Sequence, residues 1–137
     1  MSPADPIRVL IADDSPTALR SVCEYLEFAG WFEIVGTVSD GQNAVQLTAL
    51  KKPDLVLLDL SMPRVNGLEA AEQIRLSSPD LRVIIFSELH GLSLADECRR
   101  HGADSFVPKN LLPEALLLEI QRLFARSRSI EAGAEPY

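Results

Sequence analysis

Five polar residues occur where apolar runs of the sequence end, and their types suit a single chemical task. Asp13 and Asp14 follow the first apolar run, Asp59 ends the third, Ser87 follows the fourth, and Lys109 comes shortly after the fifth. Carboxylates that lie close together repel one another, and a hard divalent cation offsets that repulsion. If the fold brings the three aspartates together, we therefore expect a Mg²⁺ site.

A lysine and a small hydroxyl beside bound Mg²⁺ would complete a cradle for the outer oxygens of a phosphoryl group. Lys109 and Ser87 supply these two groups, and Asp59 is left as the nucleophile that forms an aspartyl phosphate. Taken singly, each residue has a structural explanation: Asp13 and Asp14 as part of a helix cap, Lys109 as a surface lysine. Their joint placement at the ends of the predicted strands favours the functional interpretation.

The elements that would position these residues follow from the apolar periodicity, which predicts five strands alternating with five helices. The predicted strands cover residues 7–12, 32–38, 55–60, 81–86 and 104–107. The helices are expected after Ser15-Pro16, after Asp40-Gly41, after Gly67, over residues 94–101 and from Pro113 onward. This alternation predicts an α/β fold, a doubly wound parallel sheet with helices on both faces. Ligands bind such sheets outside the carboxyl ends of the strands, where the five polar residues lie.

The composition limits the class of protein. The chain has 137 residues, of which 47% are hydrophobic, and a net charge of −7. We expect one domain over residues 1–126 and a polar tail or linker start over 127–137. The acidic surplus argues against nucleic-acid binding by this chain alone. No apolar run reaches membrane-spanning length, so a cytoplasmic protein without membrane contact is expected, with Cys23 and Cys98 as reduced core residues.

Nearly the whole chain, about residues 7–124, resembles the receiver domains of bacterial two-component response regulators. The matching motifs are Ala12-Asp13-Asp14, Leu57–Pro63 with Gly67, Ser87, and Gly102-Ala103-Asp104 leading to Phe106 and Lys109. Each motif is weak alone, but the combination is specific. The resemblance implies a flavodoxin-like (βα)5 fold whose five-stranded parallel sheet has the order 2-1-3-4-5.

The resemblance also implies a role for each residue of the site. Asp59 resembles the phosphoacceptor, which Ser87 and Lys109 assist, and Phe106 resembles the aromatic residue that switches together with Ser87. The implied Mg²⁺ ligands are Asp14 directly, Asp13 through water, Asp59, and the backbone carbonyl of Ser61. Such a domain accepts its phosphoryl group from a sensor histidine kinase or a phosphotransfer protein. It is not an enzyme, beyond catalysing its own phosphorylation and dephosphorylation.

The last helix and its neighbours are the predicted output face. Leu116, Leu117, Ile120 and Leu123 recur at helical spacing and predict the buried stripe of that helix, which leaves Leu118 outside. In the implied fold Leu92, Leu111 and Leu112 lie nearby. We expect these exposed leucines to form a contact patch for a downstream effector or for a second copy of the chain.

Three departures from the family pattern qualify the resemblance. Asn110 replaces the proline that usually follows the lysine, and residues 109–114 look more like receivers attached to LuxR-type DNA-binding domains. Phe106 lacks the hydroxyl of the commoner tyrosine. Glu88 replaces a small residue beside the site, and its charge is predicted to slow attack on anionic phosphoryl donors.

Other classes of protein explain the sequence less well. A haloacid-dehalogenase-type phosphatase would carry an Asp-x-Asp pair after the first strand, where this chain has adjacent aspartates. A flavodoxin-type cofactor binder would need a hydroxyl-rich phosphate loop there. Two alternatives within the family stay open: a degenerate receiver that serves only as a protein-interaction module, and the detached receiver of a DNA-binding transcription regulator.

Overall fold

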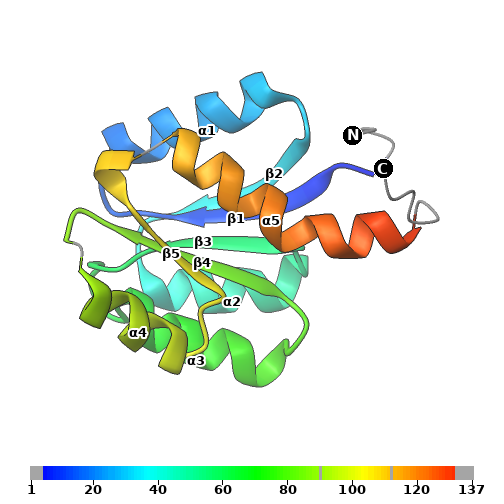
Figure 1. Ribbon diagram of the computed structural model, residues 1–137. Helices are drawn as coiled ribbons and strands as arrows, with labels where there is room; N and C mark the ends of the chain where they lie inside the picture. The colour runs from blue at the N-terminus through cyan, green and yellow to red at the C-terminus, as the bar shows by residue number, and fades with distance from the viewer. Residues whose placement is uncertain (1–4, 90, 112, 132–137) are drawn as a thin grey trace.

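The protein folds as a five-stranded sheet between two layers of helices, as seen in the computed structural model (Figure 1). The structure describes residues 5–131 except residues 90 and 112. The strands are β1 (Ile7–Ala12), β2 (Phe32–Val38), β3 (Leu55–Asp59), β4 (Arg82–Ser87) and β5 (Ser105–Pro108). The helices are α1 (Pro16–Ala29), α2 (Gly41–Lys51), α3 (Gly67–Ser77), α4 (Leu92–Arg100) and α5 (Glu114–Glu131), with the short 3-10 helix η1 (Lys109–Leu111).

All neighbouring strands run parallel, in the order β2-β1-β3-β4-β5, which confirms the predicted fold class and strand order. Parallel neighbours require a crossover connection, and α1, α2, α3 and α4 provide the four crossovers, while α5 follows the last strand. In Figure 1, α1 and α5 cover one face of the sheet, while α2, α3 and α4 cover the other. The carboxyl ends of all strands consequently meet at one edge.

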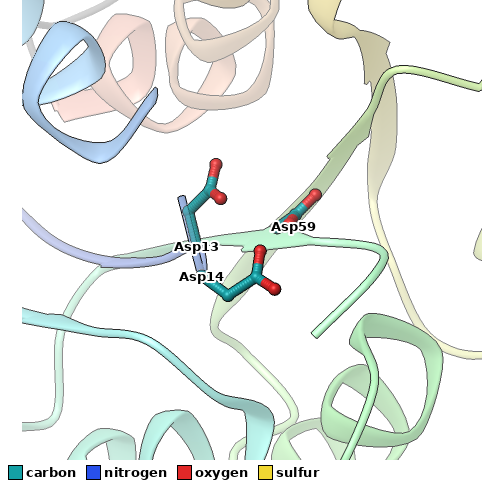
Figure 2. Close-up of side chains that lie close together, drawn as sticks. All are labelled: Asp13, Asp14 and Asp59. Carbon is teal, nitrogen blue, oxygen red and sulfur yellow. The ribbon is translucent and has the colours of Figure 1, made fainter. Parts of the chain in front are cut away.

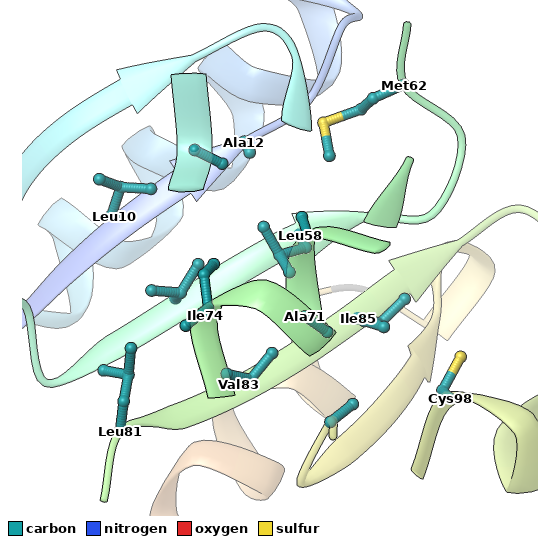
Figure 3. Close-up of a cluster of buried hydrophobic side chains, with 14 residues drawn as sticks. Leu10, Ala12, Leu58, Met62, Ala71, Ile74, Leu81, Val83, Ile85 and Cys98 are labelled. Atoms are coloured by element: carbon teal, nitrogen blue, oxygen red, sulfur yellow. The ribbon is translucent and has the colours of Figure 1, made fainter. Parts of the chain in front are cut away.

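Alternate side chains of each central strand point to opposite faces of the sheet and contribute to two separate hydrophobic cores. Val9 and Ile11 of β1 belong to the core beneath α1 and α5, whereas Leu10 and Ala12 belong to the core on the opposite face. Figure 3 shows this second core, in which Ile74 of α3 packs against strand residues. Both faces are covered, so the central strands consist almost entirely of apolar residues.

Side chains that cap the helices explain where several of them begin. The hydroxyl of Ser15 accepts a hydrogen bond from the backbone N–H of Ala18 at 3.2 Å, and Pro16 occupies the first helical position. The carboxylate of Asp40 accepts one from the N–H of Asn43 at 2.7 Å. These contacts confirm the helix starts that were predicted at Ser15-Pro16 and Asp40-Gly41.

The last helix differs from its prediction in length and in its buried stripe. It continues to Glu131, five residues into the segment that was expected to be a polar tail. No glycine or proline occurs before Gly133 to end the helix. Of the predicted stripe, Leu116 and Ile120 are buried and Leu123 packs against the same core together with Phe124, whereas Leu117 is half-buried and is not among the described residues of this core.

Both cysteines are free thiols, as expected. Cys98 is fully buried in the core beneath α4, and burial raises the pKa of its thiol to about 11. Such a thiol is almost entirely protonated at neutral pH and is therefore unreactive. Within residues 5–131, as far as the structure describes them, no helix combines the length and the apolar content needed to cross a membrane.

Candidate functional site

Three aspartates meet at the carboxyl edge of the sheet, as Figure 2 shows. Each offers a carboxylate oxygen, and these oxygens all lie within 4.8 Å of one another. Parallel pairing of β1 with β3 places Ala12 beside Leu58, so that Asp13 and Asp59 follow as neighbours. Asp13 and Asp59 are buried, with 1% and 5% of their surface exposed, whereas Asp14 is exposed.

Lys109 joins two of these carboxylates. Its ammonium nitrogen Nζ lies 2.9 Å from Oδ2 of Asp13 and 3.3 Å from Oδ1 of Asp59. It also lies over the ring of Phe86, 5.1 Å from the ring centre. The predicted lysine is thus brought to the aspartates by η1, which follows β5 directly. The role of Phe86 was not predicted, because its position in an apolar strand suggests only a core residue.

Burial and charge together perturb the ionisation of this cluster. Burial and then the charge of Asp13 raise the pKa of Asp59 to about 6, against the opposing effect of Lys109. Burial tends to lower the pKa of Lys109, but its hydrogen bond to Asp13 and the charges of Asp59 and Asp13 raise it overall. Lys109 is therefore positively charged at neutral pH. Its single charge compensates only one of the two negative charges that Asp13 and Asp59 carry when both are ionised.

Ser87 ends β4 at the same edge. Asp59 pairs with Phe86 across the sheet, so that Ser87 stands one residue further along β4 than the partner of Asp59. Only 3% of its surface is exposed. Its hydroxyl oxygen accepts a hydrogen bond from the N–H of Leu89 at 3.0 Å, which leaves the hydroxyl hydrogen available to a further acceptor.

An open cavity of about 520 Å³ lies beside the cluster, and Asp14 and Ser61 are among the residues that line it. Ser61 belongs to the loop between β3 and α3, as the predicted ligand set requires. A larger cavity, about 840 Å³, lies at the amino edge of the sheet beside Thr48 and Asp54. Its lining mixes basic and acidic side chains, and it is at the opposite end from the aspartate cluster.

The residues around the cavity suit a hard divalent cation. Asp14 makes no hydrogen bond or ion pair with any residue in the described part of the chain, so its carboxylate is available. Three carboxylates face a single lysine, which leaves an excess of negative charge. Mg²⁺ prefers one or two carboxylates and keeps several waters, a coordination that an open cavity allows.

Of the predicted switch residues, Ser87 ends β4 at the aspartate edge and Phe106 lies within β5, while the described patch residues belong to α4, η1 and α5. Phe106 of β5 is half-buried and packs against the core on the α2–α4 face. Leu92, Leu111 and Leu118 are exposed, with 88%, 51% and 65% of their surface accessible, as the patch prediction requires. Leu112, the fourth residue of the predicted patch, lies outside the described residues. Glu88 is exposed next to Ser87.

Comparison with known proteins matches the chain to one family over most of its length. The family described as the response regulator receiver domain matches residues 9–121. The nitrate/nitrite response regulator protein NarL of Escherichia coli K12 is 31% identical over 136 residues, which is 99% of this chain and 63% of NarL. The chain thus spans less than two thirds of this relative.

Solved structures agree in fold. A two-component response regulator of the LuxR family from Aurantimonas superposes with a TM-score of 0.83 at 27% identity, covering 88% of this chain and 86% of that one. A chain of the CheX-CheY-BeF3-Mg²⁺ complex from Borrelia burgdorferi superposes with a TM-score of 0.81 at 30% identity. That match covers 87% of this chain and 90% of the other.

Proposed function

Because the chain belongs to the response regulator receiver domain family, we propose that it receives a phosphoryl group on the carboxylate of Asp59. One observation carries this assignment. Asp59 is the buried carboxylate that ends the central strand β3, within 3.3 Å of the ammonium group of Lys109 and in one cluster with Asp13 and Asp14. Receiver domains are signalling modules, and this one acts only on its own aspartate.

The transfer requires groups that this edge of the sheet provides. A carboxylate oxygen of Asp59 attacks the phosphorus of a phosphohistidine, the P–N bond breaks, and the leaving imidazole takes up a proton. Lys109 offsets negative charge on the transferred group, and the hydroxyl of Ser87 donates a hydrogen bond to one of its oxygens. The product is an acyl phosphate on Asp59.

We propose Mg²⁺ as the cofactor. Asp14, Asp59 and the backbone carbonyl of Ser61 would hold it directly, and Asp13 would act through a water molecule. When bound, the ion neutralises phosphoryl oxygens and offsets the repulsion among the carboxylates. The Borrelia burgdorferi structure, to which this chain is similar, contains Mg²⁺ together with BeF3.

Asp14→Asn is expected to weaken Mg²⁺ binding more than Asp13→Asn does. Asp13 already accepts hydrogen bonds from the N–H of Ser15 at 2.9 Å and from Lys109, whereas Asp14 has no such partner among the described residues. Replacing a residue that acts on the ion through water lowers the affinity for Mg²⁺ about 10-fold, and replacing a direct ligand lowers it further. Calorimetric titration with Mg²⁺ measures both variants, and equal losses would contradict the ranking.

Glu88→Ala is expected to accelerate phosphorylation by acetyl phosphate. The exposed carboxylate of Glu88 follows Ser87 directly and repels an anionic donor, over distances of about 10 Å at 0.1 M salt. The acceleration should therefore be largest at low ionic strength and fade as salt is added. Glu33→Ala, an exposed glutamate near the amino end of β2, is the matched control. Equal rates of wild type and Glu88→Ala at low salt would exclude this role.

A groove next to Lys109 supports the assignment of a sensor histidine kinase or phosphotransfer protein as donor. The groove has a volume of about 660 Å³ and lies between α1 and the start of α5, lined mainly by apolar atoms that include those of Tyr25 and Leu116. Phe28 at its rim is 91% exposed. A helical partner that buries these side chains would bring its phosphohistidine to the edge where Asp59 lies.

We propose that phosphorylation alters the face of α4, β5 and α5, which then contacts an effector or a second copy of the chain. Binding of Ser87 to the phosphoryl group would let the half-buried Phe106 turn further inward, a two-state change that the ligand biases. With beryllofluoride and Mg²⁺, amide NMR signals of residues 88–118 should therefore shift. Ser87→Ala should retain the shifts near Asp59 and lose most of those beyond residue 88. Wild-type shifts confined to the Asp59 loop would mean that this face carries no signal.

The proposed function as a whole is tested by intact mass measurement. After incubation with acetyl phosphate and Mg²⁺, the protein should gain one phosphoryl group, and EDTA should prevent the gain. A protein that binds partners but never becomes labelled would be the degenerate, interaction-only receiver. The chain spans 63% of NarL, so the detached receiver of a DNA-binding regulator remains the second candidate for the whole protein. A cytoplasmic location is proposed with it, in keeping with the two free thiols.

A further inference from the structure

The loop between β3 and α3 forms one wall of the cavity beside the aspartates, and local hydrogen bonds hold both of its ends. The N–H of Gly67 donates to the carbonyl of Leu60 at 2.9 Å, which closes the loop at its base. At its exit, Asn66 and Glu69 exchange hydrogen bonds in a capping box. Ser61, one of the loop residues that line the cavity, lies between these fixed points.

The middle of the loop rests on the first turn of α2. The backbone of Val65 lies so close to Gly41 that an added Cβ would overlap the carbonyl oxygen of Val65 and would lie 2.6 Å from its carbonyl carbon. This neighbour is backbone, so no side-chain rotation can relieve the overlap. Any residue other than glycine at position 41 must therefore push the loop away from α2.

The loop backbone beside this contact adopts an unusual turn. The N–H of Val65 donates to the carbonyl of Pro63 at 2.8 Å, across Arg64, whose φ is 68°. A three-residue turn with positive φ at its centre is rare and strained for a residue with a side chain. The guanidinium of Arg64 lies 3.8 Å from the carboxylate of Asp40, which also caps α2. Contacts with α2 are thus what holds this turn in place.

We propose that Gly41 is a positioning residue for the phosphorylation site. Its lack of a side chain lets the β3–α3 loop settle on α2, and this contact holds the backbone of Ser61 at the cavity that it shares with Asp14. The inference rests on the proposed function, since the position of the Ser61 carbonyl matters to chemistry only if a cation binds there. Neither Gly41 nor Val65 contributes a ligand atom.

Gly41→Ala tests the proposal because two interpretations predict opposite results. As an ordinary helix residue, alanine would stabilise α2 and leave Mg²⁺ binding unchanged. If the added Cβ instead pushes the β3–α3 loop away from α2, alanine should lower the melting temperature and shift the amide NMR signals of residues 60–66 in metal-free protein. It should also weaken Mg²⁺ binding about 10-fold. Gln42→Ala, at the exposed neighbouring helix position, should change none of these quantities. Unchanged loop signals and Mg²⁺ affinity in Gly41→Ala would overturn the proposal.

Arg64→Ala decides the matter if Gly41→Ala does not fold. This change removes a cation, so electrostatics alone would strengthen Mg²⁺ binding, whereas loss of the contact with Asp40 should weaken it and shift the same amide signals. Stronger binding with unchanged loop signals would refute the role of the α2 contact. A wild-type protein that binds no Mg²⁺ would instead refute the proposed function itself.

Discussion

Asp59→Asn is expected to abolish phosphorylation of the protein by acetyl phosphate and Mg²⁺. Asparagine keeps the shape of the side chain and its contact with Lys109, but its amide oxygen is too weak a nucleophile to form an acyl phosphate. Intact mass measurement should show full labelling of wild type and none of the variant. Asp59 is the expected nucleophile because it is the carboxylate that ends the buried strand β3.

Asp54→Asn is the matched control for this loss. Asp54 directly precedes the same strand, but it lies at the opposite edge of the sheet, where its carboxylate accepts a hydrogen bond from the N–H of Arg8 at 2.9 Å. This variant should be labelled like wild type. Labelling of Asp59→Asn at the wild-type level would refute the assignment, whereas labelling lost equally in both variants would point to a general effect on the fold.

The same Asp59→Asn change is expected to stabilise the metal-free protein at neutral pH. The pKa of Asp59 is about 6 in the folded protein, above the ordinary value of 3.8 that an unfolded chain would show. The folded state therefore binds more protons than the unfolded state between these values, and this group lowers stability as pH rises from about 4 to 6. Above pH 7 the penalty from the ionised carboxylate is complete, and it amounts to at most about 3 kcal/mol because solvent screening reduces it.

Urea unfolding in EDTA measures this difference. The free energy of unfolding of Asp59→Asn should exceed that of wild type most at pH 7.5, and the gap should fall to about half at pH 5. Mg²⁺ should raise the stability of wild type and narrow the gap at pH 7.5, because the cation replaces the missing positive charge. A gap that is independent of pH would show that repulsion within the aspartate cluster is not its cause.

The fold followed from local patterns that the sequence carries by itself. The continuous apolar run of β3 indicates a strand that is buried on both faces, as in a parallel sheet covered by helices on both sides, and every residue of β3 is buried. Ser15, Pro16 and Asp40 marked helix starts through capping, a chemistry that involves neighbours in sequence. The location of Asp13, Asp14 and Asp59 at one edge followed from topology, since carboxyl ends of parallel strands must meet there.

Only the tertiary structure decided how these residues interact. Sequence placed Lys109 at the same edge as the aspartates, but not its ion pairs with Asp13 and Asp59 or its contact with the ring of Phe86. The contact of the β3–α3 loop with Gly41 could not be predicted from the sequence either, because Asp40-Gly41 is fully explained there as the start of a helix. The raised pKa of Asp59 depends on its burial and on its short distances to Asp13 and Lys109, two charged residues that are far from it in the sequence. Packing and electrostatics act through space, and a linear pattern encodes neither directly.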